Sequence, residues 1–204
     1  MRRGEPQSIV NELAHADTDA LLRRACDGDA TAFAGLVRMH QSSVFSIGYR
    51  MLRRRDAAED LAQDVFLQLY RKLDSIESHD HLGFWLRRVA ANLAIDRLRR
   101  VPYTATRSFD DVDAVAEPES ADATDDHLMT RALSKLLGEL APAPRAVMVL
   151  RYQEDRDVAE IAAALDMPVN TVKSHIKRSL TALRARMVGA SLITAANSFE
   201  EEQS

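Results

Sequence analysis

Apolar residues recur every three or four positions through most of this 204-residue chain, and that spacing predicts helices. No segment sustains the two-residue alternation that is typical of a half-buried strand. In the first half, the pattern predicts four helices, the second starting near Asp29 and the third following Asp56. Their expected core positions are Phe33, Leu36, Val37, Val44 and Ile47 in the second helix, Ala58, Leu61, Ala62, Val65, Phe66, Leu69 and Leu73 in the third, and Phe84, Trp85, Val89, Leu93 and Leu98 in the fourth. We therefore expect an all-α fold.

In the second half, two predicted helices flank a tight turn. Asp157 and Glu160 have the spacing of a capping box at the start of the first helix. Asp166 tolerates left-handed backbone geometry, and Pro168 is accepted only in a first helical turn, so the chain turns between them. The expected buried positions are Val158, Ile161, Ala162 and Leu165, then Val172, Ile176, Leu180, Leu183 and Met187. Because residues 169–187 contain no acid, this helix-turn-helix has a basic exposed face that suits a DNA groove.

Composition supports helices and a chain that needs no disulfide. Hydrophobic residues make up 46% of the sequence, against only 7 glycines and 6 prolines. The single cysteine, Cys26, excludes an intramolecular disulfide, and we expect it to be a buried small residue of the first helix. No apolar run approaches the roughly 20 residues of a bilayer span, and no signal peptide is visible, so we expect a cytoplasmic protein.

The net charge of -4 hides an uneven distribution. Residues 101–127 contain eight carboxylates and one arginine and have no helical stripe, which predicts an acidic flexible linker. On either side, basic residues outnumber acidic ones, fourteen to twelve over 17–100 and ten to six over 128–190. We therefore expect two small helical domains over those ranges, an N-terminal extension over 1–16 and a C-terminal tail over 191–204. Because both domains have an excess of basic residues, they can approach the phosphates of nucleic acid without strong repulsion.

Three motifs in order resemble bacterial RNA polymerase sigma factors of the extracytoplasmic-function (ECF) group in the sigma-70 family. They are DAAEDLAQDVFLQLYRKL (56–73), FWLRRVAANLAIDRLRR (84–100) and VAEIAAALDMPVNTVKSHIKRSLTALR (158–184). A helix-turn-helix alone is shared by many regulators, whereas the ordered set is specific. The resemblance implies a transcription initiation factor, not an enzyme, that needs no cofactor or small-molecule substrate. Such a factor binds core RNA polymerase, recognises the −35 and −10 promoter elements with its two domains and helps to melt DNA.

The resemblance assigns polymerase contacts to the third helix, which would meet the clamp helices of the largest subunit, with the flap as a further contact. The predicted contact residues are Asp60, Gln63, Asp64 and Leu67. Their spacing of three and four places them on one helix face, where acidic groups can meet a basic helical partner. A solvated face with local side-chain pairs is the simpler alternative.

The resemblance also assigns DNA contacts. The loop before the fourth helix would receive a flipped base, the arginines of that helix would contact phosphate at the −10 element, and the last motif would recognise the −35 element. The −10 residues are Ser78, His79, Asp80, Arg87, Arg88, Asn92, Arg97, Arg99 and Arg100, and the −35 residues are Thr171, Lys173, Ser174, Lys177 and Arg178. Trp85 could stack on a base, but its apolar neighbours favour a core role. The sequence departs from the family pattern at Asp166, where glycine is frequent, and at Pro168 and Ala141.

Alternatives remain open. A stand-alone helix-turn-helix regulator would explain the second half but not the first two motifs. A metal site could be formed by His79, Asp80 and His81, although residues in this pattern more often belong to an ordinary polar loop. A nucleic-acid enzyme could use the carboxylates of the third helix, which are Asp56, Glu59, Asp60 and Asp64. Many relatives have an inhibitory anti-sigma partner, but nothing in the sequence identifies one.

Overall fold

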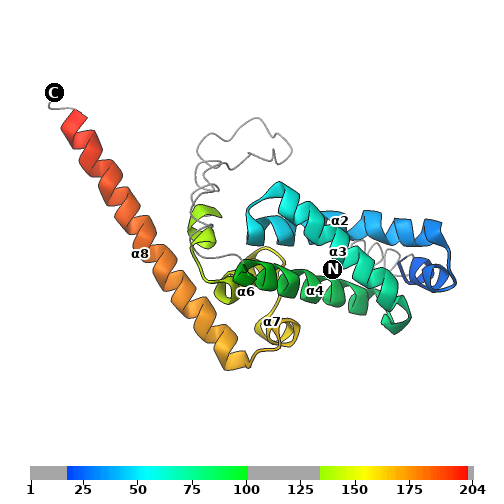
Figure 1. The fold of residues 1–204 in the computed structure, drawn as a ribbon. Coiled ribbons are helices and arrows are strands. Elements are labelled where there is room, and N and C mark those ends of the chain that lie inside the picture. The colour runs from blue at the N-terminus through cyan, green and yellow to red at the C-terminus, as the bar shows by residue number, and fades with distance from the viewer. Residues whose placement is uncertain (1–17, 101–133, 202–204) are drawn as a thin grey trace, which may run out of the picture. The chain divides into compact units, whose positions relative to one another are not determined.

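The computed structural model describes residues 18–100 and 134–201, and in the second range the side chains up to Arg186. Both ranges consist of helices joined by short turns, and neither contains a strand, which confirms the all-α prediction (Figure 1). The chain divides into two compact units close to the end of α4. The predicted N-terminal extension and acidic linker lie outside the described residues. None of the described helices is long and apolar enough to cross a bilayer.

The first unit contains a helix over 18–26, α2 (Ala30–Leu52), α3 (Arg55–Lys72), a short 3-10 helix, η1 (Leu73–Ser75), and α4 (His79–Arg100). The side chain of Asp29 caps α2 by accepting hydrogen bonds from the backbone amides of Thr31 and Ala32, at 2.9 and 3.1 Å. This cap confirms the predicted start of the second helix. The third helix begins at Arg55, so Asp56 lies in its first turn rather than before it.

The helices α2 and α3 cross closely at Gly48. A Cβ atom placed there would lie 3.3 Å from a methyl group of Leu61 and 3.4 Å from the Cα atom of Ala58, so only glycine allows this approach without a shift. The predicted core positions that prove buried are Leu36, Val44, Ile47, Ala58, Leu61, Val65, Leu69 and Leu73. Phe33, Val37, Ala62 and Phe66 are only partly buried.

The predicted core face of the fourth helix is wrong. Phe84, Trp85, Val89, Leu93 and Leu98 are all partly exposed. The buried residues of α4 are instead Leu82, Leu86, Ala90, Ala91, Ala94 and Ile95. Half of these buried residues are alanines, which the predicted pattern of large apolar side chains did not include. Trp85 is therefore partly buried and lies beside the fully buried face of α4.

Cys26 is also misplaced by the prediction, because its side chain is exposed. It is the last residue of the helix over 18–26, next to the turn at Asp27 and Gly28, where the helix no longer covers its side chain.

The second unit contains a helix over 134–138, α6 (Pro142–Tyr152), α7 (Val158–Leu165) and α8 (Val169–Glu201). Ala141 offers no side-chain cap to α6, and Pro142 begins the helix instead. The buried guanidinium of Arg145 donates hydrogen bonds to the carbonyl oxygens of Gly138 and Leu140, and so ties the preceding segment to α6. The helix α8 continues past residue 190, where we expected the C-terminal tail to begin.

Candidate nucleic-acid interface

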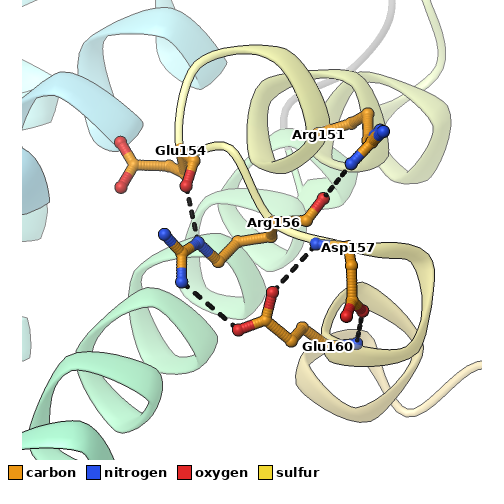
Figure 2. A network of polar contacts seen from close by, with 5 residues as sticks. All are labelled: Arg151, Glu154, Arg156, Asp157 and Glu160. Carbon is orange, nitrogen blue, oxygen red and sulfur yellow. Dashed lines mark hydrogen bonds and ion pairs between the residues drawn. The ribbon is translucent and has the colours of Figure 1, made fainter. Parts of the chain in front are cut away.

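The loop between α6 and α7 is held by a network of polar contacts around Arg156 (Figure 2). Its Nε atom donates to the carbonyl oxygen of Glu154 at 2.5 Å, and its Nη1 atom donates to the carboxylate of Glu160 at 3.2 Å. The backbone carbonyl of Arg156 in turn accepts from Nη1 of Arg151 on α6, at 2.9 Å. These contacts fix the direction in which α7 leaves the loop.

The first helix of the predicted helix-turn-helix is confirmed at both of its ends. Asp157 accepts from the amide of Glu160 at 2.8 Å, while the side chain of Glu160 accepts from the amide of Asp157 at 2.9 Å. This is the expected capping box. Asp166 ends α7 in the left-handed conformation at φ 51°, so the turn forms without the glycine that is frequent there in the family. The carbonyl of Pro168 accepts from the amide of Thr171 in the first turn of α8.

The residues predicted for −35 recognition gather on one exposed face of α8. Lys173, Ser174, Lys177 and Arg178 are exposed, and Thr171 at the beginning of the helix is partly exposed. The opposite face is buried through Val172, Ser179 and Leu183. Ile176 and Leu180, expected in the buried stripe, are only partly buried.

Sequence reasoning missed three further residues of this face, Asn170, Thr181 and Arg184, which are also exposed. They follow the spacing of three and four from Lys173 and Lys177, so the same periodicity could have identified them. The hydroxyl of Thr181 donates to the carbonyl of Lys177 at 3.0 Å, and is therefore already bonded within α8.

The residues predicted for polymerase binding are all exposed along α3. Asp60, Gln63 and Asp64 provide the polar part of this face, and Leu67 is 49% exposed. Tyr70, which the sequence analysis did not select, extends the face by one turn and is 66% exposed. Its ring and that of Phe33 on α2 form a T-shaped pair with centroids 5.3 Å apart, and this contact holds an apolar group beside the acids.

Three hydrogen bonds hold the loop before α4 and the first turn of that helix. The backbone amide of His79 donates to the carboxylate of Asp19 at 2.7 Å, and the amide of His81 donates to the hydroxyl of Ser78 at 3.2 Å. Nδ1 of His81 accepts from the amide of Glu77 at 3.2 Å. Asp80 is exposed. His79, Asp80 and His81, which were predicted in the base-binding loop, therefore lie in the first turn of α4, and the loop itself ends at Ser78.

The polar residues predicted along α4 differ in exposure. Arg88, Arg99 and Arg100 are exposed, whereas Arg87 and Asn92 are partly buried. The guanidinium of Arg87 lies across Gly83, whose position would place a Cβ atom 3.4 Å from it. Arg97 differs from all of these, because it donates to Asp64 and to the carbonyl of Ala57 on α3. The structure thus joins a residue predicted to bind DNA to one predicted to bind polymerase.

His40 lies beside the beginning of α4. Its ring centroid is 6.2 Å from that of His79. Burial, together with the nearby His79 and Arg87, lowers the pKa of His40 from its ordinary value. Its neutral form is therefore favoured in the fold.

The carboxylates at the beginning of α3 are paired with arginines. Asp56 bonds to Arg54, which lowers the pKa of the Asp56 carboxyl, and Glu59 accepts from Arg55 at 2.9 Å. Within the described parts of the chain, no group of three or more His, Cys, Asp or Glu side chains is arranged to hold a metal ion. These partners leave the enzyme alternative without support from the geometry of α3.

The comparisons with known proteins agree with the two-unit structure. The family model of Sigma-70 region 2 matches residues 36–101, and that of Sigma-70, region 4 matches residues 130–183. The ECF RNA polymerase sigma factor SigW of Bacillus subtilis is 30% identical over 178 residues, which cover 81% of this chain and 94% of SigW. The chain belongs to the ECF sigma factors. The RNA polymerase sigma-E factor of Streptomyces coelicolor is 33% identical to this sigma factor over 178 residues, covering 86% of it and 97% of sigma-E.

Two solved structures share the fold of this ECF sigma factor. CnrH, solved in complex with the cytosolic domain of CnrY, superposes with a TM-score of 0.62 at 23% identity and covers 85% of this chain and 98% of its own. The sigma factor RpoE of Bartonella quintana, solved with the anti-sigma factor NepR, gives 0.55 at 23% identity and covers 75% and 94%.

Family membership settles the class of function. The protein is a sigma factor that directs transcription initiation, and the alternative of a stand-alone regulator is not favoured. The region 2 match begins at residue 36, so Asp19 and the helix over 18–26 precede it. The roles of individual side chains stay predictions.

Proposed function

We propose that this sigma factor contacts the clamp helices of core polymerase through the face of α3 that contains Asp60, Gln63, Asp64 and Leu67. Tyr70 extends that face with an exposed aromatic ring, and aromatic groups are frequent anchors of protein interfaces. The acids would orient a basic helical partner, while Leu67 and Tyr70 would supply apolar contact area.

Two DNA contacts complete the proposal. The acid-free face of α8, which contains Lys173, Ser174, Lys177 and Arg178, enters the major groove of the −35 element. The exposed arginines of α4 bind phosphates at the −10 element, next to the loop that receives a flipped base. The observation with the greatest weight is the α8 face, because the capping box and the left-handed turn at Asp166 fix its position.

On this proposal the protein performs no covalent chemistry and acts in the cytoplasm, where it meets core polymerase and promoter DNA. Its acidic segment over 101–127 links the two DNA-binding units. A protein inhibitor that covers the α3 face is a further proposal. The support for it is that RpoE, which has the same fold, was solved with an anti-sigma factor.

Run-off transcription with core polymerase and a promoter library tests this function. The expected result is a single class of promoter, defined by two short elements at a fixed spacing. A variant with alanine at both Lys177 and Arg178 should lose transcription from that class, while Lys135→Ala, an exposed lysine outside α8, should retain it. Transcription that does not depend on either element would contradict the proposal.

A further inference from the structure

Arg97 makes two hydrogen bonds to the neighbouring helix. Its Nη1 atom donates to the carbonyl oxygen of Ala57 at 2.9 Å, and its Nη2 atom donates to the carboxylate of Asp64 at 2.5 Å. Both acceptors belong to α3, and the side chain of Arg97 is only 27% exposed. These contacts join positions 40 and 33 residues apart in the sequence.

The arrangement of the two acceptors determines what Arg97 can fix. Ala57 and Asp64 are separated by two helical turns, so they lie on the same side of α3. A guanidinium is planar and presents its donors in a fixed fork, so the two bonds together restrict sliding and rotation of α4 against α3. Arg97 is therefore able to lock α4 on α3.

The same contacts make Arg97 a poor phosphate ligand. To reach DNA, it would have to give up an ion pair and a backbone hydrogen bond, and it would leave Asp64 without this partner. Arg99 and Arg100, farther along α4, are exposed and need no such exchange.

We infer that Arg97 is a positioning residue that holds the DNA-binding helix α4 on the polymerase-binding helix α3, with Asp64 as its partner. This inference rests on the proposed roles of those two helices. It changes the role of Arg97 from the phosphate contact that the sequence suggested. It also gives Asp64 a second role, because its carboxylate supports α4 as well as facing polymerase.

The first experiment compares Arg97→Ala with the matched control Arg99→Ala. Both variants are assembled with saturating core polymerase, so that differences in core affinity do not matter. Two quantities are measured: the salt dependence of promoter binding and the rate of promoter opening. A fluorescent base analogue in the −10 segment reports the opening. Arg99→Ala should lower the salt slope by about one, as expected for one lost phosphate contact. Arg97→Ala should leave the slope unchanged and slow opening by about fivefold.

A double-mutant cycle tests whether Arg97 acts through Asp64. Asp64→Asn keeps the bond between Arg97 and Ala57 and should slow opening by about twofold. Promoter opening with the double variant should be no slower than with Arg97→Ala alone, because Asp64 has already lost its partner in Arg97→Ala. Arg97→Lys, which can reach one acceptor but not both, should restore part of the rate. Melting curves establish that each variant is folded at the assay temperature.

The outcomes separate this inference from the proposed function. If Arg97→Ala lowers the salt slope as Arg99→Ala does, or opens at the parental rate, the inference is overturned. Independent, multiplying effects of Asp64→Asn and Arg97→Ala overturn it as well. If Arg99→Ala and Arg100→Ala also leave the slope and the opening rate unchanged, the proposed −10 role of α4 fails instead.

Discussion

The carboxylate of Asp19 accepts a hydrogen bond from the backbone amide of His79 at 2.7 Å, across 60 residues of sequence. The first amides of a helix have no partner within that helix, and a negative charge is favourable at its N-terminus. Asp19 therefore caps α4 from the helix over 18–26. The loop proposed to receive a base thus depends on a residue that precedes the matched region 2.

Replacing Asp19 by alanine should remove this cap and destabilise the first unit by about 1 kcal/mol. Promoter opening should also slow, because the start of α4 loses its anchor. Urea unfolding of the full chain and the opening assay measure the two effects. Asp27→Ala, an exposed acid just beyond the same helix, is the control and should change neither. Equal behaviour of the two variants would show that the cap has no role.

Stability should depend on pH through His40. The pKa of His40 is lowered by burial, and further by His79 and Arg87, so the unfolded chain binds a proton more readily than the fold does. The contribution of neutral His40 to the free energy of unfolding is therefore fully present above about pH 6.5. It is lost as the pH falls toward the lowered pKa, because the unfolded chain takes up a proton first. Urea midpoints between pH 7.5 and 5.5 should fall less in a His40→Gln variant than in the parent. An identical decline in both would assign the pH dependence to other groups.

The features that were predicted best depend on residues close together in the sequence. The caps at Asp29 and Asp157 and the left-handed residue Asp166 follow from side-chain chemistry within four positions, and the structure confirms all three. The exposed face of α8 was equally accessible, because it depends only on helical periodicity.

Tertiary relationships were not predictable in this way. The buried face of α4 was missed because the prediction favoured large apolar residues such as Phe84 and Trp85 over Ala90 and Ala94, which allow close packing. The bond between Asp19 and His79 and the pair of Asp64 with Arg97 connect distant segments, and no periodicity within one helix contains that information. Arg97 was predicted to contact phosphate for this reason, because a cluster of arginines in the sequence does not reveal which of them is already bonded within the fold.

The contact of Asp64 with Arg97 makes Asp60 the better test of polymerase binding. Asp60 is exposed on the same face of α3, so Asp60→Ala should weaken core affinity by about threefold to tenfold. Binding of core polymerase can be titrated with fluorescently labelled sigma factor. Asp74→Ala, an exposed acid beyond α3, is the control. Unchanged affinity in Asp60→Ala would remove this part of the proposed interface.

For −35 recognition, the structure allows phosphate contacts to be separated from base contacts on α8. Lys177→Ala should weaken promoter binding about uniformly across −35 sequences and lower the salt slope by about one if the lysine contacts phosphate. A base contact at Arg178 would behave differently, because its replacement should cost about 1–3 kcal/mol for the preferred sequence and relax the preference at one position. Binding of the holoenzyme to a −35 library at several salt concentrations measures both effects. Arg184→Ala, on the same exposed face nearly two turns farther along, shows how far the contact extends. If all three variants keep both the affinity and the specificity of the parent, α8 is not the helix that recognises the −35 element.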